Sequence, residues 1–174
     1  MKGLIHVYTG DGKGKSTSAI GLSIRCAGNG KKVIYTQFLK DNQSSELKII
    51  KEIDNISFIP CVNNYGFYSQ MTEDQKVKAK EMYTDLLEKV IEGAKTTDCQ
   101  LLVLDEVILA YKFRLIDQNS FLHFLQTKPE GLEVVMTGRY APDELIELAD
   151  YVSEIKKIKH PYDNGILARD GIEL

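Results

Sequence analysis

The sequence has 174 residues, which is enough for one domain with a substantial core and too short for two ordinary domains. A formal net charge of −3 argues against a protein that wraps nucleic acid through a basic face. No apolar run is long enough to cross a bilayer, so we expect a single domain over residues 1–174, a cytoplasmic location, and neither nucleic acid nor membrane as a partner.

A strand, a glycine-rich loop and a helix follow one another at the start of the chain. Residues 4–8 are mostly strand formers and predict a central strand, and residues 16–27 have the spacing of a helix. Between them lies TGDGKGKST, in which glycines at positions 10, 12 and 14 allow backbone amides to face an anion. Lys15 adds a positive charge and Ser16 a hydroxyl that suits magnesium. The segment therefore predicts a phosphate-binding loop.

The loop departs from the pattern G-x-x-x-x-G-K-[ST] in two respects. Thr9 stands at the position of the first glycine, and Asp11 places a negative charge inside a loop meant for phosphate. We expect Asp11 to face away from the ligand or to pair with Lys13 or Lys31. A glycine-rich turn without a ligand is the alternative, but the strand, the loop, the Lys-Ser pair and the helix occur together, which favours nucleotide binding.

Strand and helix patterns alternate along the rest of the chain. Short apolar runs predict strands at 32–38, 56–60, 100–105, 132–136 and 151–155. Helical spacing predicts helices at about 45–53, 72–95 and 142–149, and a further helix capped by Asp117 or Asn119. The final segment alternates charges and turns, which predicts a strand pair that carries His160 toward the site. The alternation is typical of an α/β fold with a mostly parallel sheet and helices on both faces.

Acidic residues follow the apolar run that ends at Asp105. An acidic side chain at the carboxyl end of a buried strand can lie beside a phosphate loop and hold magnesium, and Glu106 adjoins it. Two acidic residues here resemble P-loop ATPases that place an extra strand between the two signature strands. A solvated acidic turn is the alternative, and the phosphate loop argues against it.

Arg139 emerges at the same edge and can bind phosphate or ribose oxygens. Arg25, two to three turns along the first helix, reads by itself as a solvated charge.

An irregular aromatic segment covers residues 61–72. It contains NNYGFY, with Phe67 and Tyr68 beside a glycine and no convincing period. Such a loop can close over a flat ligand or a partner, or it can be pinned to the surface by its own side chains. The spacing leaves both possibilities open.

At this point the sequence resembles the P-loop type of ATP:cob(I)alamin adenosyltransferase, also called corrinoid adenosyltransferase. The matching words are TGDGKGKS at 9–16, QFLK at 37–40, LVLDEV at 102–107, TGR at 137–139, ELADYVSEI at 147–155 and KHPYDNGILARDGIEL at 159–174. They span almost the whole chain in order, and the family shares the non-glycine at Thr9. The resemblance implies a three-layer P-loop NTPase fold of the RecA-like type. It also implies transfer of the 5′-deoxyadenosyl group of ATP to the cobalt of a reduced corrinoid, with triphosphate leaving.

The resemblance also implies roles for individual residues. Cob(I)alamin is a strong nucleophile, so the protein needs no general base and has only to align cobalt with C5′ and stabilise the leaving triphosphate. The implied catalytic residues are Lys15, Glu106 and Phe67, and the implied magnesium ligands are Ser16 and Glu106, supported by Asp105. The implied nucleotide-binding residues are Thr9, Gly10, Asp11, Gly12, Lys13, Gly14, Lys15, Ser16, Thr17, Arg25 and Arg139. The implied corrinoid-binding residues are Phe67, Tyr68 and His160.

The family further implies partners. ATP, Mg²⁺ and cobalamin are the expected ligands, a flavodoxin-like or flavin reductant would supply Co(I), and the expected assembly is a homodimer. Two family features differ here: the chain has no Trp, with Ser69 near the position of the usual tryptophan, and Met1 leads almost directly into the first strand. We therefore expect the amino-terminal helix of many relatives to be absent or supplied otherwise. Two alternatives stay open: an ATPase or small-molecule kinase that yields ADP, and a nucleotide-gated corrinoid carrier without turnover.

Overall fold

The computed structural model describes residues 2–173 and places six strands in one parallel sheet with the order β3-β2-β4-β5-β1-β6. The strands are β1 (Ile5–Thr9), β2 (Lys32–Gln37), β3 (Ile56–Ile59), β4 (Cys99–Asp105), β5 (Glu133–Thr137) and β6 (Tyr151–Glu154). β5 lies between β1 and β4, so one strand separates the strand before the glycine-rich loop from the strand that ends in Asp105. This is the extra strand that the two acidic residues predicted.

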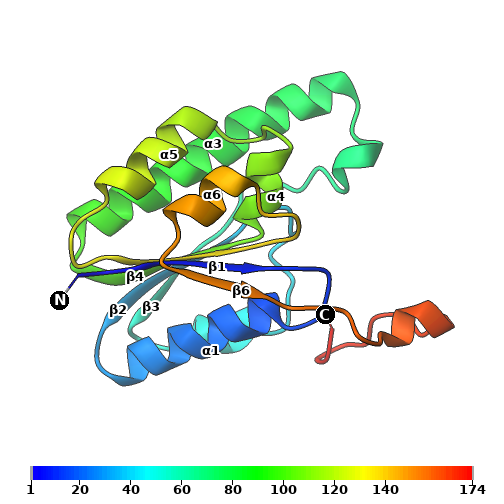
Figure 1. The fold of residues 1–174 in the computed structure, drawn as a ribbon, viewed down its shortest axis with the longest axis horizontal. Helices are drawn as coiled ribbons and strands as arrows, with labels where there is room; N and C mark the ends of the chain where they lie inside the picture. The colour runs from blue at the N-terminus through cyan, green and yellow to red at the C-terminus, as the bar shows by residue number, and fades with distance from the viewer. Residues whose placement is uncertain (1, 174) are drawn as a thin grey trace.

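Helices cover both faces of the sheet (Figure 1). They are α1 (Lys15–Gly28), α2 (Leu47–Ile50), α3 (Glu73–Thr96), α4 (Val107–Lys112), α5 (Gln118–Thr127) and α6 (Asp143–Leu148), with short 3-10 turns η1 (Tyr68–Gln70) and η2 (Pro161–Asn164). α1 and α2 pack on one face, and α3, α4, α5 and α6 pack on the other. The predicted α/β architecture of three layers is confirmed. None of the helices within residues 2–173 combines the length and apolar character needed to span a membrane.

Two helix starts follow from side-chain capping. Thr72 Oγ1 accepts a hydrogen bond from the backbone N–H of Gln75, and Gln75 Oε1 accepts one from the N–H of Thr72, so a capping box begins α3 where the sequence predicted it. Asp117 Oδ1 accepts from the N–H of Ser120 at 2.6 Å and begins α5. Of the two capping residues that the sequence allowed, the structure uses Asp117.

Two expectations about secondary structure were incomplete or wrong. α4 was not predicted, because Val107, Ile108 and Ala110 are fully buried and the helix lacks a polar face that would give it a period. The strand pair predicted at the end of the chain is also wrong: residues 155–173 contain turns and η2 but no strand. This segment leaves the sheet after the edge strand β6, and Figure 1 shows it projecting beyond the sheet.

Candidate active site

The carboxyl ends of the strands gather the predicted nucleotide residues at one edge of the sheet. The glycine-rich loop follows β1, Asp105 ends β4 with Glu106 directly after it, and Arg139 follows β5, and these three strands are neighbours in the sheet. Because all strands are parallel, the three connections meet at one edge (Figure 1). The structure thus brings together the groups that the sequence assigned to a nucleotide site.

Lys15 lies at the first turn of α1 and is only 7% exposed. Its Nζ donates a hydrogen bond to the carbonyl oxygen of Gly12 at 2.8 Å, so the side chain curls back over the loop. Burial lowers the pKa of this ammonium, Glu106 opposes that effect, and the positive charge of Arg139 adds to it. A buried ammonium with a carbonyl as its hydrogen-bond partner gains strongly from an anion.

Asp105 is fully buried at the end of β4 and accepts hydrogen bonds from two directions. Thr137 Oγ1 donates to Oδ1 at 2.6 Å, and Lys40 Nζ donates to Oδ2 at 2.7 Å. Lys40 Nζ also lies 3.4 Å from Ser16 Oγ. Burial alone would lower the pKa of Lys40, but the charge and hydrogen bond of Asp105 outweigh it and the pKa is raised. Sequence reasoning assigned no role to Lys40, although its place after β2 at this edge was a usable signal.

Glu106 begins the turn into α4 with a left-handed backbone, φ 60°. Its N–H donates to Thr137 Oγ1 at 2.9 Å, which holds the residue beside Asp105. Its Oε2 is buried and has no hydrogen-bond partner among the described residues. Burial raises the pKa of Glu106, and the neighbouring Asp105 raises it further. A strained residue with an unsatisfied carboxylate oxygen is typical of a functional site.

The oxygens of this cluster fit magnesium. Mg²⁺ is commonly bound through one or two carboxylates together with substrate phosphates, rather than by a complete protein cage. Ser16 Oγ, Asp105 and the unsatisfied Glu106 Oε2 are such oxygen donors. Within residues 2–173, no group of three or more His, Cys, Asp or Glu side chains forms a ready-made metal cage. A metal here would therefore depend on the nucleotide for part of its coordination.

The remaining loop residues contact other parts of the chain. Thr9 Oγ1 accepts from the N–H of Ala141 at 3.2 Å, and Gly12 N–H donates to the carbonyl of Ile155 at 2.8 Å. Asp11 Oδ1 accepts from the N–H of Lys157, and this bond holds the pKa of Asp11 below its usual value. Asp11 therefore turns toward the segment after β6, and of the two arrangements that we expected, the pairing with Lys13 or Lys31 is not the one that the structure has. Lys13 instead pairs with Glu173 at 3.1 Å.

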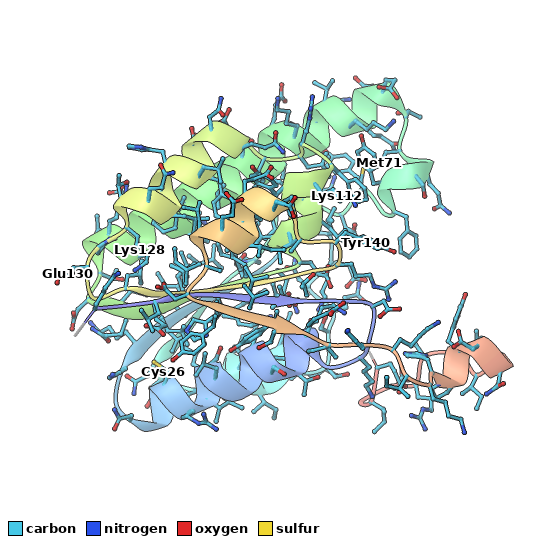
Figure 2. All side chains as sticks on the ribbon, viewed as in Figure 1. Cys26, Met71, Lys112, Lys128, Glu130 and Tyr140 are labelled. Atoms are coloured by element: carbon cyan, nitrogen blue, oxygen red, sulfur yellow. The ribbon has the colours of Figure 1, made fainter. Side chains whose placement is uncertain are left out.

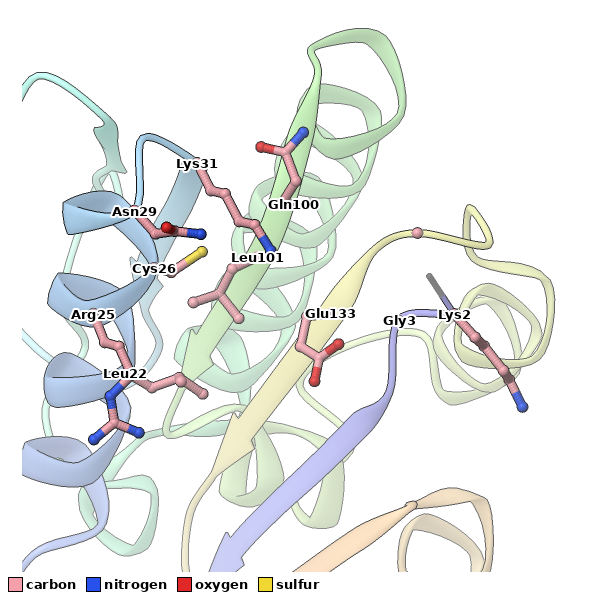
Figure 3. A pocket seen from close by; sticks show the side chains of 11 residues that line it. Lys2, Gly3, Leu22, Arg25, Cys26, Asn29, Lys31, Gln100, Leu101 and Glu133 are labelled. Atoms are coloured by element: carbon pink, nitrogen blue, oxygen red, sulfur yellow. The ribbon is translucent and has the colours of Figure 1, made fainter.

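The two candidate arginines have different positions. Arg139 follows β5 at the same edge of the sheet as the loop and the carboxylates, and its positive charge lowers the pKa of both Lys15 and Glu106. Arg25 lies ten residues beyond Lys15 on α1, about 15 Å along the helix axis. It is exposed and lines a cavity of 510 Å³ that Lys2, Leu101 and Glu133 also line (Figure 3). The structure brings Arg139 to the site and leaves Arg25 at this cavity.

In the aromatic segment before α3, Tyr68 supports one of the two possibilities that the sequence left open, a loop pinned by its own side chains, and closure over a flat ligand stays a prediction. The Tyr68 ring stacks on Phe113 with centroids 4.3 Å apart, and Lys76 Nζ lies 5.1 Å from the Tyr68 centroid, so Tyr68 pins the loop. Phe67 is 76% exposed. Sequence reasoning missed Tyr140, which follows Arg139, is exposed and has Lys112 Nζ 4.4 Å from its ring centroid (Figure 2).

His160 caps η2, where its Nδ1 accepts from the N–H of Tyr162 at 3.2 Å. Figure 1 shows η2 at the lower right, on the α1 side of the sheet, whereas the aromatic segment lies on the α3 side. The structure of one chain thus does not bring His160 to Phe67 and Tyr68.

Comparisons with solved structures support the fold. Solved structures of the EssC ATPases 2 and 3 from Geobacillus thermodenitrificans (TM-score 0.55, 13% identity, 99% of this chain and 35% of that one) and of the KaiC-like protein PH0186 from Pyrococcus horikoshii (TM-score 0.51, 13% identity, 89% and 73%) share the fold. At that identity they establish the fold alone, which is the RecA-like P-loop fold that the sequence predicted.

Sequence relatives carry the comparison further. Corrinoid adenosyltransferases from Sinorhizobium sp. (35% identity, 99% of this chain and 80% of that protein) and from Escherichia coli K12 (28% identity, 99% and 86%) align over nearly the full length. The family profile described as ATP:corrinoid adenosyltransferase BtuR/CobO/CobP matches residues 1–174. The family profile and these relatives together show that the chain belongs to the ATP:corrinoid adenosyltransferase family.

Proposed function

We propose that residues 1–174 form one catalytic domain that holds the triphosphate of ATP in residues 9–17 and presents C5′ to a corrinoid. The reaction is adenosyl transfer from ATP to a corrinoid. The electron pair of Co(I) attacks C5′, a Co–C bond forms, the C5′–O bond breaks, and triphosphate leaves with the bonding electrons. Since the cobalt supplies the electron pair, the protein contributes alignment and charge stabilisation.

The main support for the proposal is that the ammonium of Lys15 is buried without a carboxylate partner in the described part of the chain. Its ammonium is buried, its hydrogen bond goes to the Gly12 carbonyl, and no carboxylate among residues 2–173 lies within ion-pair distance of it. Triphosphate oxygens supply the anion that this group lacks. Arg139 adds a second positive charge near the loop, where negative charge develops on the leaving group.

Magnesium is proposed at Ser16 and Glu106, with Asp105 in support. The support is the unsatisfied Oε2 of Glu106 and the convergence of Asp105 and Ser16 on one ammonium. When bound there, Mg²⁺ would neutralise charge on the departing triphosphate. Glu106 would orient that ion, and Thr137 would hold Glu106 and Asp105 in place through its two hydrogen bonds.

The corrinoid is proposed to bind against Phe67, Tyr68 and His160. The exposed Phe67 ring offers an apolar surface that can exclude an axial ligand of cobalt, which would ease reduction from Co(II), and the stacked Tyr68 fixes the loop that carries it. His160 belongs to the end of the chain, where large apolar side chains are exposed, among them Ile158, Tyr162 and Leu167. Such exposure favours a second copy of the chain as the cover, so we propose a homodimer. A flavodoxin-like or flavin reductant and a cytoplasmic location stay predictions.

The test is anaerobic incubation of the protein with ATP, magnesium and chemically reduced cobalamin. We expect the visible spectrum of adenosylcobalamin and one triphosphate for each corrinoid converted. ADP with an unchanged corrinoid spectrum would point to an ATPase or kinase, and binding of both ligands without turnover would point to a carrier. Lys15→Met should abolish ATP binding, whereas Lys48→Met, at an exposed lysine of α2, should leave it unchanged.

A further inference from the structure

Lys40 lies where two neighbouring strands bring the magnesium-binding oxygens together. β2 pairs with β4 so that Gln37 is opposite Asp105, and the N–H of Phe38 donates to the Asp105 carbonyl at 2.8 Å. Leu39 then adopts a left-handed backbone, φ 54°, which few bulky residues do. This turn directs Lys40 back over the edge of the sheet rather than away from it.

The ammonium of Lys40 contacts two of the three groups proposed for the metal. Its Nζ lies 2.7 Å from Asp105 Oδ2 and 3.4 Å from Ser16 Oγ, and the side chain is 25% exposed. Asp105 has no exposure, and a buried carboxylate needs a counter-charge in the absence of a metal. One positive charge therefore already lies between the Asp105 carboxylate and the Ser16 hydroxyl.

A metal ion and this ammonium would compete for the same oxygens. Two cations that share Asp105 Oδ2 repel each other strongly in a buried setting. If Lys40 withdraws, Asp105 keeps the hydrogen bond that Thr137 donates to it. Gln37 Nε2, which lies 3.4 Å from Asp105 Oδ2 in the structure, can then donate a shorter hydrogen bond to that oxygen. The contact with Ser16 shows that the ammonium already borders the phosphate loop, so the triphosphate is the nearest new partner for it.

We propose that Lys40 is a positioning residue that holds the oxygens of Asp105 and Ser16 before the metal binds, and then exchanges Asp105 for the triphosphate of ATP. The inference rests on the magnesium site proposed above. In this exchange Lys40 keeps the buried carboxylate neutralised in the nucleotide-free enzyme. It then becomes an additional cation for the leaving group once Mg²⁺ and ATP are bound.

The first test measures Mn²⁺ binding by electron paramagnetic resonance and ATP binding by calorimetry, both without corrinoid. Lys40→Met keeps the side-chain length and removes the charge; we expect Mn²⁺ to bind the nucleotide-free protein about tenfold more tightly and ATP to bind about tenfold more weakly, each the effect of one close charge contact. Lys40→Arg keeps the charge and should leave both affinities within about threefold of the wild type. Lys48→Met is the matched control and should change neither.

The outcomes separate this inference from the magnesium site itself. If Glu106→Gln weakens Mn²⁺ binding but Lys40→Met tightens nothing, the site stands and Lys40 is a permanent structural ion pair. If neither Glu106→Gln nor Asp105→Asn changes Mn²⁺ binding, the site is misplaced and the inference fails with it.

A second test uses the wild-type enzyme, because Lys40→Met leaves a buried carboxylate without its cation and can destabilise the fold. An ammonium fixed in an ion pair gives a distinct ¹H–¹⁵N NMR signal, which Lys40→Arg assigns by its loss. We expect addition of Mg²⁺ and ATP to shift this signal. A signal that stays in place when ATP is saturating would overturn the exchange of partners.

Discussion

Thr137→Val should reveal how strongly one hydroxyl holds the two acidic residues of the site. Thr137 is fully buried at the end of β5, and valine has nearly the same shape and suits a strand. Its hydroxyl donates to Asp105 Oδ1 at 2.6 Å and accepts from the N–H of Glu106 at 2.9 Å. The substitution removes a donor from a buried carboxylate and leaves a backbone N–H without its partner.

The expected cost follows from these two bonds. A hydrogen bond to a charged group contributes about 1.5–3 kcal/mol, and an unsatisfied buried donor costs about 1–3 kcal/mol; since the two losses share one atom, we expect roughly 3 kcal/mol in all. For a chain of this size, each kcal/mol lowers Tm by roughly 2–4 °C, so the expected fall is roughly 6–12 °C.

Thr36→Val is the matched control. Thr36 is also fully buried in a strand, but its hydroxyl makes one neutral bond, to the carbonyl of Ile59 at 2.8 Å. We expect its loss to cost about 1 kcal/mol. Urea and thermal unfolding of both variants give the comparison, with ATP binding as a second readout that Thr137→Val alone should weaken. If Thr137→Val costs no more than Thr36→Val, the hydroxyl does not hold the site as we argue.

Three further substitutions test separate parts of the site. Phe67→Ala should change stability by less than about 0.5 kcal/mol, because the ring is 76% exposed. It should nevertheless slow the reaction that starts from Co(II) far more than the reaction that starts from chemically prepared Co(I). Equal losses of rate from both starting states, followed by the visible spectrum, would remove the role of Phe67 in reduction. Burial raises the pKa of the Glu106 carboxyl in the folded protein above its value in the unfolded chain, and Asp105 raises it further. The folded state is therefore favoured while this carboxyl is protonated, and that contribution to stability is lost as pH rises through the pKa of the folded state. Glu106→Gln should therefore stabilise the ligand-free protein near pH 7 by about 0.5–2 kcal/mol and give no gain near pH 4, and urea unfolding at both pH values checks the sign. Glu173→Gln frees Lys13 from its 3.1 Å ion pair and should raise the ATP affinity about threefold at low salt, an effect that calorimetry should find reduced at high salt.

Most of the fold could be predicted because its elements carry local signals. The strands β1 to β5 are runs rich in apolar residues, β6 begins with the strand formers Tyr151 and Val152, and the start of α3 is signalled by Thr72 and Gln75. α4 could not be found, since four of its six residues are buried and a helix of six residues is too short to show a polar period. The strand pair at the end of the chain was predicted wrongly because alternating charged and apolar residues are also typical of an edge strand. Whether such a segment pairs depends on a neighbouring strand, which the local sequence does not reveal.

The contacts of the candidate site also differ in whether the sequence could predict them. Lys15, Asp105 and Arg139 could be predicted to converge, because strand ends in a parallel sheet meet at one edge. The contact between Lys40 and Asp105 could not, because it depends on the register of β2 against β4 and on the left-handed turn at Leu39. Both are long-range or strained features, and neither leaves a period in the sequence.

Phosphate binding is not the only reason for glycines in the loop, because two of them are also required by close packing against another segment. A Cβ at Gly12 would lie 2.8 Å from the Ile155 carbonyl oxygen, a Cβ at Gly10 would collide with the same group, and the Gly12 N–H is already bonded to it. These two glycines therefore let the segment after β6 pass directly over the loop. Since Asp11 and Lys13 are tied to the same segment, through Lys157 and Glu173, we expect any partner that displaces the end of the chain to rearrange also the loop proposed for the triphosphate.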